Sequence, residues 1–413
     1  MATVKPFRAI RPAAEFVKDV AALPYDVYNR QEAKEAVANK PYSFLNIDRP
    51  ETQFPDDTDM YSDKVYEKAK EMLTDQIQKG IYTQDWNECY YIYELVMDGR
   101  SQAGIVACVS IDDYLNGTVM KHENTREEKE LDRIRHVDTC DAHTGPIFLA
   151  YRGQEELNKI MRQVMENDKL YEFTSEDHIS HHVWKIEDKD LVAKISSIFA
   201  NMDKIYIADG HHRAASAVKV GLKRREENPG YTGKEEFNYF LSVLFADESL
   251  MIMDYNRSVK DLNGLSEDEF LMEVSKNFAI ENMGETPYRP GKKGEVGMYL
   301  SGNWYALTFN GDTNFANPVD ALDVSILQKY LLDPILAIKD PRTDPRISYI
   351  GGIRGLEELK RRADSDMKVS FAMYPTSIGE LFAVADAGLL MPPKSTWFEP
   401  KLRSGIFLHK LSE

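Results

Sequence analysis

Apolar and polar positions along the chain follow helical spacing in some segments and strand spacing in others. Apolar residues that recur every three or four positions are typical of a helix packed on one face, and short apolar runs bounded by turn residues are typical of strands. Helical segments are expected at 31–39, 59–79, 153–166, 188–200, 266–277 and 321–332. Strands are expected at 89–97, 104–111, 239–246, 298–310, 368–374 and 380–386. Because no strict strand–helix–strand rhythm connects them, the pattern predicts an α+β protein with mixed sheets and packed helices.

Two features of the pattern predict how the chain is organised. Asp98-Gly99 lies between the first two strands and predicts a hairpin turn. The pattern restarts after Tyr255-Asn-Arg257, which favours a boundary near residue 260 and domains at 1–260 and 261–413. A chain of 413 residues is long enough for two or three domains with a core in each.

The segment from Lys204 to Lys223 carries the most specific chemical signal. An apolar strand over 204–208 runs into the turn Asp209-Gly210, and helical spacing begins at His211. His211, His212 and Arg213 therefore occupy the first turn of a helix, where free N–H groups and the helix dipole attract anions. Gly210 allows a close backbone approach, and Arg213 can hold a phosphate with two hydrogen bonds. The structural alternative is an Asp209 N-cap followed by a solvated first turn, but packing does not explain two histidines and an arginine in a row.

A second group of polar residues lies between Lys121 and His136. Thr125 and Glu128 have capping-box spacing, which predicts a helix from about Arg126 and places His122 and Glu123 just before it. A carboxylate beside a histidine at the end of an element can accept a proton from a hydroxyl group. Arg126, Lys129 and Arg133 would share one helical face, with Glu130 beside them. The alternative is a solvated helix stabilised by ion pairs.

Three weaker candidates lie near proline residues, and one histidine cluster has metal-like spacing. Asp26 and Ser43 follow Pro24-Tyr and Pro41-Tyr, and Lys394 follows Pro392-Pro393. Each could face a ligand, although structural turns and a C-terminal tether are the alternatives. His178, His181 and His182 lack a neighbouring cysteine or further carboxylate ligand, so we expect surface or loop histidines and no protein metal site.

Composition and missing motifs exclude several classes of function. A net charge of −17 disfavours general binding to nucleic acid. The three cysteines do not form a Cys-x-x-Cys pair, which favours a reduced, cytoplasmic protein. We expect neither a signal peptide nor a membrane-spanning helix, because the first twenty residues lack an apolar core and no long apolar run occurs. P-loop, Gly-x-Gly-x-x-Gly, Gly-x-Ser-x-Gly and His-Glu-x-x-His motifs are also absent from the sequence.

Several segments resemble known families. Asp209-Gly-His-His-Arg213 resembles the phosphate-binding box of the ParB/sulfiredoxin superfamily, whose free serine kinases carry Asp-Gly-His-Thr-Arg. Segments distributed along the chain resemble the prokaryotic domain-of-unknown-function family DUF1015. They are Lys5-Pro-Phe-Arg-Ala-Ile-Arg-Pro12, Leu23-Pro-Tyr-Asp-Val27, Pro41-Tyr-Ser-Phe-Leu45, Lys121-His-Glu-Asn-Thr125, Thr144-Gly-Pro146, Tyr255-Asn-Arg257 and Met391-Pro-Pro-Lys-Ser-Thr396.

These resemblances imply a ParB/sulfiredoxin-like core with N-terminal elaborations and a C-terminal α/β region. They imply a nucleotide-dependent phosphotransferase acting on a small hydroxyl compound, with free L-serine as the first candidate and O-phosphoserine as its product. ATP or ADP would be the nucleotide, and Mg²⁺ commonly accompanies such transfers. Sulfinic-acid reduction is not available, because His211 stands where sulfiredoxin has its cysteine.

The residue roles follow from the same reasoning. Glu123, Asp209 and His122 are the candidate catalytic residues, and Asp26, Ser43 and Lys394 are the candidate substrate contacts. The candidate phosphate or nucleotide contacts are Gly210, His211, His212, Arg213, Arg133 and Arg257. The competing function is a nucleotide sensor that binds its ligand without turning it over. The sequence leaves the oligomeric state open.

Overall fold

The computed structural model describes residues 1–412, which form two compact units. Unit 1 comprises Met1–Leu250 and the C-terminal stretch from Pro400, and unit 2 comprises Met251–Glu399. The division therefore falls before the boundary predicted near residue 260, because the strand Tyr255–Val259 pairs with strands of unit 2. The C-terminal stretch returns to unit 1, where Leu408 exchanges backbone hydrogen bonds with Ile10 at 2.8 and 3.0 Å.

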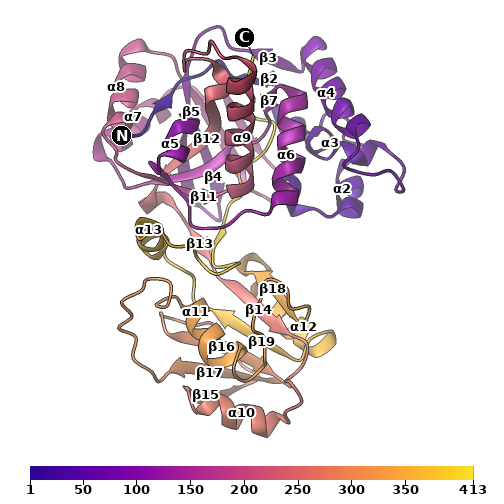
Figure 1. Ribbon diagram of the computed structural model, residues 1–413, viewed down its shortest axis with the longest axis vertical. Helices are drawn as coiled ribbons and strands as arrows, with labels where there is room; N and C mark the ends of the chain where they lie inside the picture. Colours follow the sequence, from indigo (N-terminus) through magenta and orange to yellow (C-terminus); the bar gives the residue numbers. More distant parts are fainter. Residues whose placement is uncertain (413) are drawn as a thin grey trace. The chain divides into compact units, whose positions relative to one another are not determined.

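Unit 1 is built on a nine-stranded mixed sheet (Figure 1). The strand order is β6-β11-β8-β12-β5-β4-β10-β9, and β1 pairs with β5. These strands are β1 (Val4–Lys5), β4 (Tyr90–Met97), β5 (Arg100–Ser110), β6 (Val119–Met120), β8 (Ile147–Tyr151), β9 (Tyr171–Thr174), β10 (Ser180–Ile186), β11 (Ile205–Asp209) and β12 (Tyr239–Ala246). Short strand pairs add β2 (Ile10–Pro12) with β3 (Tyr82–Gln84) and β7 (Ala142–His143) with β21 (His409–Lys410). The predicted α+β class is confirmed.

The hairpin between β4 and β5 forms at the predicted turn. Asp98 and Gly99 both have positive φ, 51° and 78°, as a tight two-residue hairpin turn requires. Met97 consequently pairs with Arg100, and the register continues to Tyr91 opposite Val106. This hairpin fixes the centre of the sheet.

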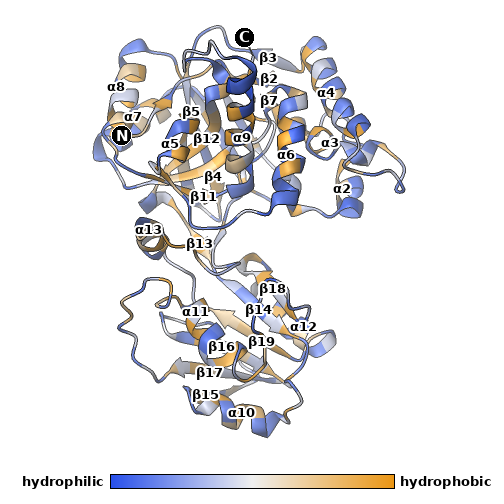
Figure 2. Ribbon diagram, viewed as in Figure 1, coloured by the Kyte–Doolittle hydropathy of each residue, from blue (hydrophilic) through white to orange (hydrophobic). Residues whose placement is uncertain are grey.

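The helices of unit 1 cover the sheet and build a lobe beside it (Figure 1). They are α1 (Val17–Val20), η1 (Tyr25–Val27), α2 (Arg30–Val37), α3 (Leu45–Asp48), η2 (Pro50–Gln53), α4 (Asp63–Gln78), α5 (Ile111–Leu115), α6 (Glu127–Cys140), α7 (Glu155–Met165), α8 (Lys189–Ala200), α9 (His211–Glu227), η3 (Glu236–Asn238) and η4 (Asp247–Ser249). Helices α6 and α9 lie side by side and join through Val137 and Val220. Both helices carry hydrophilic and hydrophobic residues (Figure 2). Helix α9 buries small apolar residues such as Ala214 and Val218, whereas α6 buries the polar Glu130, Arg133 and His136 beside Val137.

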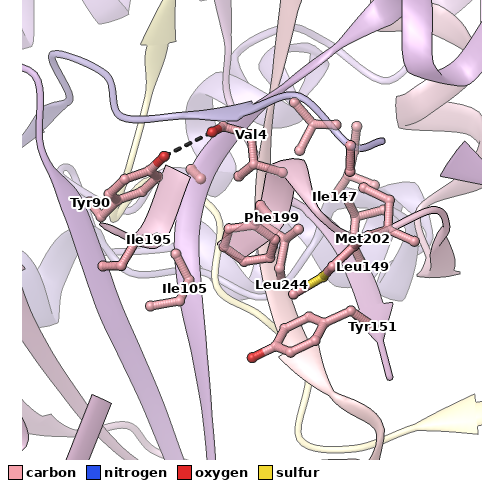
Figure 3. Packing of buried hydrophobic residues seen from close by; sticks show 14 of the residues in the cluster. Val4, Tyr90, Ile105, Ile147, Leu149, Tyr151, Ile195, Phe199, Met202 and Leu244 are labelled. Atoms are coloured by element: carbon pink, nitrogen blue, oxygen red, sulfur yellow. Dashed lines mark hydrogen bonds between the residues drawn. The ribbon is translucent and has the colours of Figure 1, made fainter. Parts of the chain in front are cut away.

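The main core lies between the sheet and helices α7, α8 and α9. Phe199, Ile105 and Leu149 are fully enclosed there, and the Tyr90 hydroxyl donates to the carbonyl oxygen of Val4 at 2.8 Å (Figure 3). Each such apolar side chain contributes about 1.5–3 kcal/mol when it leaves water. Strand β11 belongs to this core as well. Its packing fixes the position of its last residue, Asp209.

Histidine residues predicted to lie on the surface or in loops prove to be partly structural. His181 is fully buried in β10, where its Nδ1 lies 2.9 Å from the Tyr93 hydroxyl. His182 lies 2.6 Å from Glu94 on the neighbouring strand. The prediction was wrong for both residues because their partners lie on β4, distant in sequence. His178 alone occupies a turn, with φ of 63°.

Unit 2 contains a six-stranded sheet with the order β15-β17-β16-β19-β14-β18, and β13 pairs with β20. Its strands are β13 (Ile252–Met253), β14 (Tyr255–Val259), β15 (Phe278–Gly284), β16 (Glu295–Leu300), β17 (Asn303–Phe309), β18 (Ile347–Gly351), β19 (Val369–Met373) and β20 (Trp397–Phe398). Its helical segments are α10 (Glu267–Ser275), α11 (Asp323–Leu327), the π-helical η5 (Gln328–Leu332), η6 (Gly352–Arg354), α12 (Gly355–Ser365) and α13 (Ile378–Asp386).

The strand predicted at 380–386 is wrong, because this segment is helix α13. Ser377 caps its N-terminus, and a reciprocal capping box with Glu380 satisfies two backbone N–H groups. Leu381, Phe382, Val384 and Ala385 are buried, and their spacing places them on one helical face. A mostly apolar segment of this length does not distinguish strand from helix, and the Ser-x-x-Glu signal decides it.

Candidate functional site

The predicted strand–turn–helix junction is present in unit 1. Strand β11 ends at Asp209, Gly210 has φ of 90°, and helix α9 begins at His211. An α-helix leaves the N–H groups of its first turn without partners inside the helix, and α9 is 17 residues long. A Cβ atom on Gly210 would lie 3.4 Å from Nε of Arg213, in addition to the strain of the positive φ. The glycine therefore lets the arginine fold back over the turn.

Asp209 and Arg213 are held in place by polar contacts. Lys401 donates to Oδ2 of Asp209 at 2.8 Å, and the N–H of Gly210 donates to Oδ1 at 2.7 Å. Burial acts to raise the pKa of Asp209, but Lys401 and Arg213 outweigh it, so the net shift is downward and the carboxylate stays ionised. Arg213 donates from Nη1 to the carbonyl oxygen of Pro146 at 2.8 Å. This contact orients the guanidinium group.

Lys401 is a site residue that the sequence analysis missed. It lies 192 residues after Asp209 in the chain. The Pro-Lys-Leu-Arg sequence around it has no spacing relation to the Asp209 turn. Only the return of the C-terminal stretch to unit 1 brings the two side chains together.

His122, Glu123 and His211 meet on one side of this turn. The N–H of His122 points to Nε2 of His211 at 3.5 Å, and the two rings are 4.5 Å apart in an edge arrangement. Oε2 of Glu123 lies 3.9 Å from Nδ1 of His211. Burial lowers the pKa of His122 to about 4, and burial together with His122 lowers that of His211 well below its ordinary value. Both imidazoles are neutral at neutral pH, so His211 contributes a backbone N–H rather than a positive charge to the first turn of α9.

His212 lies on the other side of the turn, against the start of α6. Its Nε2 accepts a hydrogen bond from the N–H of Arg126 at 3.0 Å. The capping box expected between Thr125 and Glu128 is absent, because Arg126 is the N-cap residue and has no side-chain cap. Thr125 donates instead to Glu130, which is buried and also binds Lys219. Burial and Lys129 lower the pKa of His212, whereas Glu130 and Asp26 act in the opposite direction.

The three basic residues predicted to share one face of α6 differ in exposure: one is buried and two are exposed. Arg133 is buried, stacks on the Tyr25 ring at 4.0 Å and pairs with Asp132 at 2.9 Å. Arg126 and Lys129 are exposed. Arg133 and Arg213 both line a cavity of about 20 Å³, which is room for roughly one water molecule. The structure thus brings Arg133 and Arg213 to the same buried space.

Asp26 and Ser43 line two different hollows. Asp26 lines one of about 160 Å³ together with Tyr25, Lys129 and Arg133. Ser43, itself buried, lines a larger one of about 520 Å³. Arg403 lines this larger hollow as well and pairs there with Asp177. Asp26 is therefore linked to the Arg213 cavity through Tyr25 and Arg133, whereas Ser43 belongs to a separate recess.

Arg257 and Lys394 belong to unit 2. Arg257 is buried in β14, stacks on Tyr349 at 5.5 Å and donates to the carbonyl oxygens of Tyr255 and Lys394, the latter at 3.0 Å. Lys394 has φ of 57°, and its ammonium lies 5.6 Å from the centre of the Tyr255 ring. The two residues thus form a local contact within unit 2, and their predicted ligand roles stay predictions.

No group of three histidine, cysteine, aspartate or glutamate side chains within residues 1–412 is placed to hold a metal ion. No helix in this part of the chain has both the length and the apolar character needed to cross a membrane. All three cysteines, Cys89, Cys108 and Cys140, are unpaired and buried.

Comparison with protein families identifies the chain. Residues 4–325 match the family described as "Protein of unknown function (DUF1015)". The chain belongs to the DUF1015 family. Of the residues discussed above, the match includes the Asp26 turn, the α6 segment and the Asp209–Arg213 junction. The chain has no match among curated proteins.

Solved structures similar to this DUF1015 protein share little sequence with it. C-terminally truncated SbnI from Staphylococcus aureus is 12% identical, with 71% of this chain and 82% of that chain covered and a TM-score of 0.38. A point mutant of a free serine kinase in complex with ADP is 16% identical over 71% of this chain and 87% of its own, with a TM-score of 0.36. A conserved hypothetical protein from Pyrococcus furiosus is 15% identical over 73% and 94%, with a TM-score of 0.34. Likenesses this distant leave the reaction of the present protein open.

Proposed function

We propose that this DUF1015 protein is a nucleotide-dependent phosphotransferase that acts on a small hydroxyl compound, with free L-serine as the first candidate acceptor. A phosphate box of the ParB/sulfiredoxin type at Asp209–Arg213 is part of the proposal. The observation that carries it is the junction of β11 and α9. There, a left-handed glycine, the first turn of a long helix and a folded-back arginine lie at the end of one strand.

This junction suits a phosphate for electrostatic reasons. First-turn N–H groups and the positive end of the helix dipole favour an anion. Arg213 adds a planar cation whose remaining N–H groups can bind two phosphate oxygens. Lys401 offsets the charge of Asp209, so that this carboxylate does not repel the ligand as strongly as an unpaired one. Phosphoryl transfer relies mainly on such positioning and charge stabilisation.

The proposed step transfers the terminal phosphoryl group of the nucleotide to the acceptor oxygen. The P–O bond to the nucleotide breaks, a new P–O bond to the acceptor forms, and the hydroxyl proton leaves. Glu123, next to His211 at the same turn, would accept that proton. Mg²⁺ that accompanies a nucleotide is coordinated mostly by phosphate oxygens and water, so one carboxylate ligand from the protein is enough. Asp209 would be that ligand, and the ion would neutralise negative charge on the phosphates.

A nucleotide sensor is the second candidate. It is favoured by the fact that Asp209 already has an ion-pair partner in Lys401, as expected of a carboxylate that fixes a binding loop. Both functions need the same anion site. They differ in whether a product forms.

Product analysis separates the two functions. The full chain is incubated with Mg²⁺, L-serine and either ATP or ADP, and phosphorus NMR detects O-phosphoserine. Product formation supports the kinase. Nucleotide binding by calorimetry without any product, over a panel of hydroxyl acceptors, supports the sensor. No nucleotide binding at all would reject both.

Arg213→Ala tests the anion site itself. We expect nucleotide affinity to fall by about tenfold or more, because the variant loses charged hydrogen bonds to phosphate. Arg224→Ala is the matched control, since Arg224 lies in the last turn of the same helix and forms ion pairs with Asp138 and Asp141. Equal affinities for wild type and Arg213→Ala would show that Arg213 does not touch the ligand.

A further inference from the structure

The 160 Å³ hollow shares Tyr25 and Arg133 with the 20 Å³ cavity that Arg213 of α9 lines. Asp26 and Lys129 line the hollow as well. Pockets for drug-sized ligands usually start at about 300 Å³. The hollow therefore suits a molecule of a few heavy atoms rather than a nucleotide.

The inner wall of this hollow consists of charges that satisfy one another. Arg49 pairs with Glu51 at 2.5 Å, and Arg133 pairs with Asp132 at 2.9 Å. Asp132 also accepts a hydrogen bond from the Tyr66 hydroxyl at 2.8 Å. These groups give the hollow a polar wall without a large net charge, so they do not by themselves select a cation or an anion.

The rim differs from the wall. Asp26 and Lys129 are exposed, and within residues 1–412 the side chain of neither forms a hydrogen bond or an ion pair. One carboxylate and one ammonium therefore remain available at the same hollow. Each would contact a ligand group of the opposite charge at little desolvation cost, because both are already in contact with solvent.

The position of Asp26 is fixed by its neighbours in the chain. Arg49 donates from Nη1 to the carbonyl oxygens of Tyr25 at 3.0 Å and Tyr28 at 2.7 Å, which flank Asp26. The Arg133 guanidinium stacks on the Tyr25 ring at 4.0 Å. The buried side chains of Arg49 and Arg133 thus hold the short helix η1 in place, and this fixes the position of the Asp26 carboxylate.

We infer that this hollow binds the phosphoryl acceptor and that the acceptor is a small zwitterion, an α-amino acid with a side-chain hydroxyl. The inference rests on the proposed function. Lys129 contacts the ligand carboxylate and Asp26 contacts the ligand ammonium. A simple anion would face Asp26 and a simple cation would face Lys129, so only a ligand with both charges satisfies both rim groups. Held by these two charges, the ligand keeps its hydroxyl available to the neighbouring phosphate site.

Calorimetry on the full chain without nucleotide tests the charge assignment. The ligands are L-serine, 3-hydroxypropanoate, which lacks the ammonium, and 2-aminoethanol, which lacks the carboxylate. We expect Lys129→Gln to weaken L-serine about tenfold and to leave 2-aminoethanol unchanged. Asp26→Asn should weaken L-serine and 2-aminoethanol by a similar factor and leave 3-hydroxypropanoate unchanged.

The matched controls are Lys18→Gln and Asp19→Asn. Both residues are exposed and line the separate 520 Å³ hollow, so neither change should affect L-serine. Circular dichroism verifies that all four variants are folded. L-serine affinity that is unchanged in both rim variants would overturn the inference, as would the absence of L-serine binding to the wild type.

The same variants distinguish this inference from the proposed function. If L-serine binds with the expected charge pattern but no phosphoserine forms with any nucleotide, the zwitterion site stands and the kinase fails. If phosphoserine forms and both rim variants keep the wild-type KM for serine, the kinase stands and the acceptor site lies elsewhere, which overturns the inference.

Discussion

The charged side chains next to the α9 junction in unit 1 differ in their partners from two charged side chains of unit 2, Arg257 and Asp323. In unit 1, three charge pairs lie around the α9 junction: Arg49 with Glu51, Arg133 with Asp132 and Asp209 with Lys401. In unit 2, Arg257 is buried, and in the part of the chain that the structure describes its hydrogen-bond acceptors are backbone carbonyls and no carboxylate; burial lowers its pKa to about 10. Among residues 1–412, only the N–H of Gly294 donates hydrogen bonds to the Asp323 carboxylate of unit 2, and burial raises the pKa of Asp323 to about 6.

The difference has a consequence for each unit. A paired charge keeps its protonation state over a wide pH range and holds its neighbours in one geometry, which suits a binding site. A lone buried charge is close to neutralisation and makes the surrounding fold sensitive to pH. We therefore expect binding chemistry in unit 1 and pH-dependent stability in unit 2.

The largest expected effect comes from breaking a buried pair in unit 1. Arg49→Met leaves Glu51 buried and alone, and releases the carbonyls of Tyr25 and Tyr28. We expect the free energy of unfolding of unit 1 to fall by about 3–5 kcal/mol. Hydrogen exchange resolved along the sequence measures each unit separately. Lys40→Met is the control, because its pair with Glu176 is largely exposed and contributes about 1 kcal/mol or less. Equal losses in the two variants would contradict the comparison.

The next effect concerns the reaction that we propose for unit 1. Glu123→Gln should lower the turnover of phosphoserine formation by about 10²-fold, within the usual range for a general base, and leave nucleotide affinity nearly unchanged. Single-turnover kinetics and calorimetry measure the two quantities. The exposed Glu128→Gln is the matched control at the start of α6. Undiminished turnover would assign proton transfer to a different carboxylate.

Unit 2 should lose stability as the pH rises through the titration of Asp323. Its pKa is raised from 3.8 to about 6, so the folded state binds the proton more tightly than the unfolded state. The free energy of unfolding of unit 2 therefore falls between about pH 4 and about pH 6 and stays low above that range. Asp323→Asn keeps an acceptor for Gly294, and it should remove this slope and add about 2 kcal/mol at neutral pH. A slope that persists in the variant would exclude Asp323 as its source.

The smallest effect is expected at Arg257. Arg257→Met removes a buried charge that has no carboxylate partner, although it also releases two carbonyl groups. These contributions oppose each other, so we expect a change within about 1 kcal/mol, far below that of Arg49→Met. Chemical denaturation followed by hydrogen exchange measures both variants under the same conditions. A loss of several kcal/mol would show that carbonyl groups compensate a buried guanidinium as fully as a carboxylate does.

Local signals in the sequence were sufficient to predict most helices and strands and part of the candidate site. The apolar strand, Asp-Gly turn and helical spacing placed β11, Gly210 and the start of α9 correctly. Asp98-Gly99 placed the central hairpin in the same way. In each case the determining interactions lie within a few residues of one another, so the pattern contains them.

Contacts between residues far apart in the sequence could not be predicted from the hydrophobic pattern. Lys401 reaches Asp209 only because the chain returns to unit 1 after unit 2, and His181 is buried only because β10 lies between β4 and β9. The capping box predicted between Thr125 and Glu128 does not form, for a related reason. Glu130 contacts Lys219 of α9 and accepts the Thr125 hydroxyl, and this tertiary contact replaces the local one.

The return of the chain to unit 1 also sets the order in which the site can assemble during synthesis. Lys401 leaves the ribosome 192 residues after Asp209, and all of unit 2 is translated in between. At a synthesis rate of about 5–20 residues per second, Lys401 is added roughly 10–40 s after Asp209. During that interval the nascent unit 1 lacks β21 and the strand contacts of Leu408. The Asp209–Arg213 junction is therefore among the last parts of the protein to be completed, and on a ribosome stalled within unit 2 it would lack its contact with Lys401.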